Sequence, residues 1–186
     1  MALVSRKMLI ATINSLLLFA QIAIAQQSID SKARQSLLRT FGDSASIATV
    51  LLHLSPEEQK LVAEKSRGRW MSDSVVVYVC RIGNYTAGYG MVDNVKGKTH
   101  LITYLVALSA LGEVADIDVL AYRESYGGEV AYESFRKQFR HKTVQDKLQP
   151  GRDIKNISGA TISVHAITDG VKRILAAFEL IRLRLR

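Results

Sequence analysis

The sequence predicts an α+β domain, an antiparallel β-sheet packed by helices, and two patterns indicate this fold. Between residues 74 and 123, β-branched and aromatic runs alternate with glycine-containing breaks, as in consecutive strands. From Val164 to Leu185, apolar residues recur every three or four positions, which predicts one long C-terminal helix. The 186 residues are 48% hydrophobic and 23% charged, a globular composition. We therefore expect one such domain, preceded by N-terminal helices.

Residues 1–25 are predicted to be a signal peptide. Arg6 and Lys7 precede an apolar run that ends in a small-x-small pattern at Ala23 and Ala25, which suits a signal peptidase. We expect cleavage after Ala25 and export to the periplasm or the extracytoplasmic face of the membrane. The alternative is an uncleaved membrane anchor, because the run approaches the length that spans a bilayer.

Residues 26–73 are expected to form a helical N-terminal segment. Apolar residues have helical spacing in Ser31–Phe41 and again in Ser44–Leu54. Ser55 is a hydroxyl N-cap, and the proline and two glutamates that follow it are typical of the first turn of a helix. The segment therefore predicts three helices in succession.

Residues 74–186 are expected to form the main domain. Its four predicted strands are Val75–Cys80, Asn84–Val92, Thr99–Leu111 and Glu113–Arg123. Asp93–Lys98 is predicted to be the turn between the second and third strands. Val130–His141 returns to helical spacing, and the closing helix follows it.

Charge and cysteine content narrow the possible functions. The formal net charge is +8, but the sequence lacks the nucleic-acid reading motifs that would accompany such charge in a nucleic-acid binder. We interpret the basic residues as solvated helix faces that leave a modest preference for anionic partners. The single cysteine, Cys80, excludes an intramolecular disulfide and lies in an apolar strand, where a buried, unreactive thiol is expected. The four histidines lack metal-ligand spacing, so no metal site is predicted.

The most specific motif is Ser158-Gly159-Ala160-Thr161, just before the closing helix and followed by Ile162 and Ser163. Gly159 and Ala160 remove side-chain bulk, which lets another molecule approach the backbone closely. Unpaired N–H groups at the start of the helix favour an anion beside Thr161. An ordinary helix-entry loop with a hydroxyl cap explains the same residues, and local chemistry alone does not decide between the two.

This motif resembles the flavinylation motif of the FMN-binding domain family. The family includes the C subunit of the sodium-translocating NADH:quinone reductase and the G subunit of the Rnf complex. Tyr122–Gly127 is similar to the family's Glu-Thr-Pro-Gly segment near the flavin, and the likeness covers about Asn84–Phe178. The resemblance implies FMN as the cofactor, joined through a phosphoester to the last threonine of the motif, here Thr161. A flavin transferase that uses FAD and magnesium installs it.

The resemblance also implies a set of cofactor-binding residues and no catalytic ones. They are Thr161, Ser158, Gly159, Ala160, Ser163, Glu124, Tyr126, Gly127 and Lys155. Lys155 stands where the family often has an acidic residue, and a cation near the flavin ring would stabilise the anionic reduced form. Tyr126 is a candidate to stack on the ring.

The expected function is an exported FMN-binding electron carrier with a membrane or periplasmic redox partner. FMN supplies one- and two-electron chemistry, and no general acid–base pair in the sequence points to a substrate of the protein's own. Two alternatives stay open: a module that binds FMN without a covalent bond, and a flavin-free interaction domain of the same fold. Flavin colour that survives denaturation distinguishes the first function from both alternatives.

Overall fold

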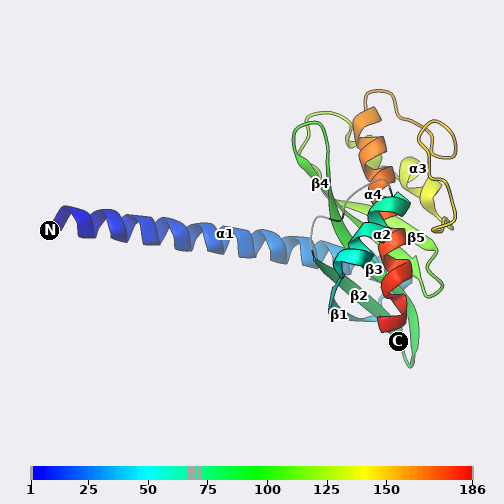
Figure 1. Cartoon of the computed structure of the whole chain (residues 1–186), viewed down its shortest axis with the longest axis horizontal. Helices are drawn as coiled ribbons and strands as arrows, with labels where there is room; N and C mark the ends of the chain where they lie inside the picture. Colours follow the sequence, from blue (N-terminus) through cyan, green and yellow to red (C-terminus); the bar gives the residue numbers. More distant parts are fainter. Residues whose placement is uncertain (1, 67–69, 71–72, 186) are drawn as a thin grey trace. The chain divides into compact units, whose positions relative to one another are not determined.

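The structure, a computed structural model, describes residues 2–66, 70 and 73–185 (Figure 1). The chain forms two compact units, Met1–Lys32 and Ala33–Arg186. The first unit consists of most of helix α1 (Ala2–Phe41), on which the apolar side chains from Leu17 to Ile24 are exposed to solvent. Among the described residues, no helix is both long enough and apolar enough to cross a membrane. Cleavage after Ala25 stays a prediction.

The second unit is built on a five-stranded antiparallel sheet, which confirms the predicted α+β class. Its strands are β1 (Ser46–His53), β2 (Ser74–Ile82), β3 (Tyr85–Lys96), β4 (Leu101–Ser109) and β5 (Val114–Ala121). They lie in the order β1-β2-β3-β4-β5, so each strand pairs with its neighbour in sequence (Figure 1). Such a meander needs only short connections between antiparallel strands.

Helix α4 (Thr161–Ile181) covers one face of this sheet. Helix α2 (Pro56–Ser66) packs against α4. A short 3₁₀ helix, Arg182–Leu185, extends α4. The apolar stripe predicted for this helix is buried at every position: Val164, Ile167, Val171, Ile174, Phe178, Ile181 and Leu185. The predicted closing helix is therefore confirmed, together with the face that it presents to the core.

A buried ion pair fixes the middle of α4 to the sheet. Arg173 donates from Nε to Asp93 Oδ2 at 3.0 Å, and the Tyr104 hydroxyl donates to the same oxygen at 3.0 Å. Asp93 and Tyr104 belong to β3 and β4. A Cβ on Gly170 would overlap the Tyr104 ring, because that ring Cζ lies 2.7 Å from the Cβ position. Breaking such a pair by removing one partner leaves a buried charge uncompensated, so it strongly constrains the position of the helix.

The last two turns of α1, Ala33–Phe41, cover the opposite face of the sheet. A Cβ on Gly90 would lie 2.7 Å from Leu37 Cδ1, and one on Gly88 would overlap the Phe41 ring. The Arg34 guanidinium lies 5.6 Å from the centroid of the Tyr78 ring on this face. The two glycines of β3 therefore let a helix approach the sheet closely.

Three predictions about local structure need correction. Ser44–Leu54 was predicted to be helical, but it contains β1, an edge strand in which Ile47, Val50 and Leu52 are half-buried and the other residues are exposed. Residues 26–73 are therefore not wholly helical. Asp93–Lys98 was predicted to be a turn, whereas β3 continues to Lys96 and the turn lies at Gly97–His100.

The third correction concerns Val130–His141, which was predicted to be one helix. It is broken into a 3₁₀ turn at Gly128–Ala131, a single α-turn (α3, Glu133–Arg136) and a second 3₁₀ turn at Lys137–Phe139. In contrast, the helix start at Ser55 is confirmed. The Glu58 N–H donates to Ser55 Oγ at 3.2 Å and the Ser55 N–H donates to Glu58 Oε2 at 2.8 Å, which is the reciprocal pair of a capping box.

Candidate functional site

Three segments that are far apart in the sequence line one open pocket of about 510 Å³. They are the β3–β4 turn, the connection that follows β5, and the start of α4. The pocket is lined by Lys98, Thr99, Glu124, Ser125, Tyr126, Gly159, Ala160, Thr161, Ile162 and Ser163. Ligand pockets typically enclose roughly 300–1,000 Å³, so this volume suits a mononucleotide-sized molecule.

The start of α4 offers unpaired backbone donors to the pocket. Ala160 is the N-cap residue and supplies no side-chain acceptor, and the first turn contains no acidic residue. The first N–H groups of a helix lack partners within the helix, and the helix dipole adds partial positive charge there. Thr161 lies at this point with an exposed side chain. Its hydroxyl is therefore accessible at a position that favours a phosphate.

The connection after β5 is held against α4 by Tyr122. Its hydroxyl donates to the Tyr126 carbonyl at 2.5 Å and lies 2.9 Å from Ser163 Oγ. Gly127 lies beside the Tyr122 hydroxyl and Ser163 Oγ, and its φ of +86° falls in the left-handed region that favours glycine. A Cβ at Gly127 would lie only 3.3 Å from Ala160 Cα. The tyrosine and the glycine therefore fix the distance between two walls of the pocket.

Glu124 connects this segment to the β3–β4 turn. One carboxylate oxygen, Oε1, accepts hydrogen bonds from the N–H groups of Thr99 at 2.6 Å and His100 at 2.9 Å. These two backbone donors lower the pKa of Glu124 below its usual value. A Cβ on Gly97 would lie 2.5 Å from Oε1, so the absence of a side chain there makes room for the carboxylate. Glu124 therefore holds the turn at the edge of the pocket.

The structure brings six of the nine predicted cofactor-binding residues to this pocket: Glu124, Tyr126, Gly159, Ala160, Thr161 and Ser163. Tyr126 is 86% exposed, so its ring is available to a ligand. The other three do not line the pocket. Gly127 follows Tyr126 in the chain and shapes the turn, and Ser158 directly precedes Gly159, the first lining residue of its loop. Lys155 is exposed on the loop before α4, and its N–H donates to Gln138 Oε1 at 2.7 Å.

Sequence reasoning missed Lys98, Thr99 and the positioning role of Tyr122. Lys98 and Thr99 were assigned to a turn or to the start of a strand, and no local pattern relates them to a helix that begins at Thr161. Only the pairing of β3 with β4 and the contact of Glu124 with the turn bring them to the site. Tyr122 lies next to the family-like segment, but its hydroxyl bonds depend on the folded turn.

The cysteine and the potential metal ligands considered in the sequence analysis do not contribute to the pocket. Cys80 is fully buried, and burial raises the pKa of its thiol to about 11, which makes the thiolate scarce at neutral pH. Within residues 2–66, 70 and 73–185, no group of three or more His, Cys, Asp or Glu side chains is arranged to hold a metal ion. The groups that the pocket offers to a ligand are backbone donors, hydroxyls, an aromatic ring and the Lys98 ammonium.

These features suit a ligand that has a phosphate and a planar ring, and comparison with known proteins indicates which ligand that is. Residues 97–176 match the model of a family described as the FMN-binding domain. All ten residues that line the pocket fall within this range. Over this range the chain matches an FMN-binding domain, and the match indicates FMN as the cofactor.

A curated relative extends this comparison. The chain is similar to the G subunit of the proton-translocating ferredoxin:NAD(+) oxidoreductase complex of Clostridium ljungdahlii, with 34% identity over 103 residues. The match covers 51% of this chain and 55% of the relative, so the chain spans about half the length of the relative that it matches.

The residues of the pocket fit FMN. The donors at the start of α4 suit its phosphate, and the exposed ring of Tyr126 offers a stacking surface for its planar ring system. Lys98 adds a cation that can approach an anionic group of the cofactor. The pocket is open rather than enclosed.

Proposed function

We propose that this chain is an exported electron-transfer flavoprotein whose FMN is esterified to Thr161. The observation that carries the proposal is the place of Thr161, which has an exposed side chain at the first position of α4 and lines the pocket with Tyr126 and Lys98. A phosphate bound to this hydroxyl would lie beside the unpaired N–H groups of the helix.

Attachment requires a donor that the chain does not supply. In the reaction that the family resemblance implies, a magnesium-dependent flavin transferase uses FAD. The Thr161 oxygen bonds to the phosphorus of the FMN half, the bond between the two phosphates breaks, and AMP leaves. The hydroxyl proton passes to solvent or to a base of the transferase. No electrons are transferred in this step, and the exposed position of Thr161 gives the transferase access to it.

The chain's own residues bind and orient the cofactor. The start of α4 holds the phosphate, Tyr126 offers a surface to the ring, and Tyr122 with Gly127 keeps these two elements at a fixed distance. FMN, when bound, supplies one- and two-electron chemistry. A covalent bond prevents loss of the cofactor by dilution outside the cytoplasm. The similarity to part of a ferredoxin:NAD⁺ oxidoreductase complex supports a membrane redox partner for this chain.

Co-expression with a flavin transferase tests the attachment. Wild-type protein should retain flavin fluorescence in a denaturing gel and gain the mass of FMN less one water, and Thr161→Ser should retain some label because it keeps a hydroxyl. Thr161→Ala should lose the label while it stays folded by circular dichroism. The matched control is Ser134→Ala, which removes an exposed hydroxyl outside both the motif and the pocket lining and should leave the label in place. Covalent flavin on Thr161→Ala would refute the assignment, and colour that is released on denaturation of the wild type would indicate non-covalent binding.

Export is tested separately. The proposed signal peptide predicts that N-terminal sequencing of the exported protein begins at Gln26. An intact Met1 in a membrane fraction would show that residues 1–25 act as an anchor.

A further inference from the structure

We infer that Lys98 is the residue that tunes the flavin potential, and that Glu124 positions it without contacting the flavin. The inference rests on the proposed binding of FMN in the pocket at Thr161. It assigns to the β3–β4 turn a role that the sequence suggested for Lys155.

Lys98 is placed by the turn that contains it, because Glu124 immobilises the two residues that follow. Oε1 of Glu124 accepts from the N–H groups of both Thr99 and His100, and the Gly97 N–H donates to the His100 carbonyl at 2.9 Å. The second carboxylate oxygen, Oε2, lies 3.7 Å from His100 Nδ1. The Glu124 side chain is only 8% exposed. Its oxygens are therefore directed at the turn and are not available as flavin contacts.

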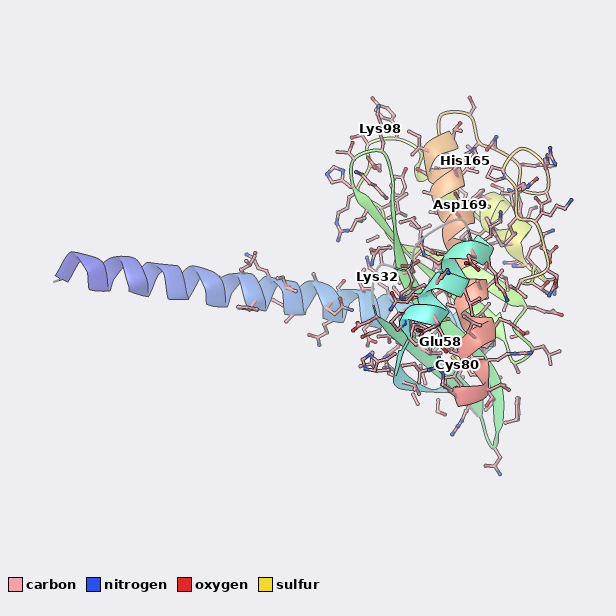
Figure 2. All side chains as sticks on the ribbon, in the orientation of Figure 1. Lys32, Glu58, Cys80, Lys98, His165 and Asp169 are labelled. Carbon is pink, nitrogen blue, oxygen red and sulfur yellow. The ribbon has the colours of Figure 1, made fainter. Side chains whose placement is uncertain are left out.

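Lys98 itself is free to meet an anionic ligand. Its side chain is exposed and lines the pocket, and Figure 2 shows it at the tip of the β3–β4 hairpin. Among the described residues, no carboxylate forms an ion pair with Lys98. The nearby Glu124 carboxylate is already engaged by two backbone donors and lies toward His100. Within the part of the chain that the structure describes, Lys98 therefore adds to the pocket a positive charge that is not held in an ion pair.

The order of contacts around the pocket places Lys98 with the ring and not with the phosphate. Ala160 at the start of α4 contacts Gly127, Gly127 follows Tyr126, and Glu124 reaches on to Thr99 and His100. The phosphate at Thr161 would lie at the first end of this series, where helix N–H groups already serve it. Lys98 belongs to the turn at the other end of this series, next to Thr99. A cation there lowers the free energy of an anionic reduced flavin, because opposite charges attract more strongly in a partly desolvated pocket.

Measurement of the midpoint potential tests this role. In FMN-loaded protein, Lys98→Met should weaken the stabilisation of reduced flavin by on the order of tenfold, which corresponds to a decrease of ~30 mV for a two-electron couple. Lys98→Arg should retain the wild-type value, because it retains the charge. Lys96→Met is the matched control: it removes a charge from the same hairpin but outside the pocket lining, and its potential should not change. The decrease should shrink at high ionic strength, as expected for an exposed charge.

A double-mutant cycle tests whether Glu124 acts through Lys98. Glu124→Ala and Glu124→Gln remove the same negative charge, but only glutamine keeps an oxygen that can accept from the turn. Glu124→Ala should therefore have a lower potential than Glu124→Gln in the wild-type background, and the two should have equal potentials in the Lys98→Met background. In the apoprotein, Glu124→Ala should also reduce the hydrogen-exchange protection of the Thr99 and His100 amides, a result that does not depend on bound flavin.

Three outcomes would overturn the inference. Equal potentials for Lys98→Met and Lys96→Met would show that Lys98 does not act on the flavin ring. A loss of flavin loading with an unchanged potential would show that Lys98 binds the phosphate instead. An equal difference between Glu124→Ala and Glu124→Gln in both backgrounds would show that Glu124 acts independently of Lys98. If wild-type protein binds no flavin at all, the proposed function fails, which is a different result from a flavin-loaded Lys98→Met with an unaltered potential.

Discussion

Replacing Gly127 by alanine should loosen the connection between the two walls of the flavin pocket. At a φ of +86°, a side chain costs about 1–2 kcal/mol in backbone strain. The new Cβ would also lie 2.8 Å from the Tyr122 hydroxyl and 3.3 Å from Ala160 Cα, and overpacking of this kind costs about 1–3 kcal/mol. The reduced entropy of the unfolded chain returns about 0.4–1 kcal/mol. We therefore expect Gly127→Ala to lower the free energy of unfolding by about 1–5 kcal/mol.

Gly159 provides a matched control for this prediction. Its φ is +81°, but a Cβ there would meet nothing within 4 Å, so Gly159→Ala should suffer the strain without the overpacking. Urea unfolding followed by circular dichroism measures both variants. With an m-value of about 2 kcal/mol/M, the midpoint of Gly127→Ala should lie about 1 M below that of Gly159→Ala. Equal midpoints would refute the argument that close approach to α4, and not backbone conformation alone, requires glycine at position 127.

Three further predictions concern the same pocket. The folded-state pKa of Glu124 lies below its usual 4.5, so its contribution to stability is complete above the unfolded-state pKa and disappears as the pH falls through the folded-state value. Hydrogen exchange should accordingly show loss of amide protection in the β3–β4 turn only in acid, and loss of protection that begins above the unfolded-state pKa would contradict this. Tyr122→Phe should lower the free energy of unfolding by roughly 1–2 kcal/mol, because the hydroxyl bonds to Tyr126 and Ser163 are lost, and an unchanged thermal midpoint would show that they contribute nothing. Tyr126→Ala should leave the free energy of unfolding nearly unchanged, because the ring is exposed. It should shift the midpoint potential and the flavin spectrum, and values identical to those of the wild type would show that this ring does not contact the flavin.

The elements that the sequence predicts correctly are those whose pattern depends on one buried face. The stripe from Val164 to Leu185 indicates α4 because each of its residues packs on the same core. The capping box at Ser55 is likewise visible, since both hydrogen bonds join residues three positions apart. Such local regularities do not require knowledge of the partner segment.

The failures occur where a distant contact overrides the local pattern. Asp93 is a typical turn residue, but it lies within β3 because Arg173, eighty positions later, neutralises it. Ser46–His53 contains apolar residues at helical spacing, yet pairing with β2 makes it an edge strand. The same reasoning applies to the site, in which Thr161 was indicated by a local motif while Lys98 was not. Its place at the pocket depends on Glu124, which lies 26 positions away in the chain.

The meander order of the sheet also determines when the pocket can first exist during synthesis. All five strands precede residue 122, and each pairs with the strand made just before it. The sheet can therefore assemble progressively as the chain emerges, whereas the face that α4 covers stays exposed until residues 161–181 are made. Both Thr161 and the helix that orients it belong to this later segment. Cofactor loading must consequently follow formation of the sheet, and a chain truncated within α4 would present neither a closed core nor a pocket in which to retain a flavin.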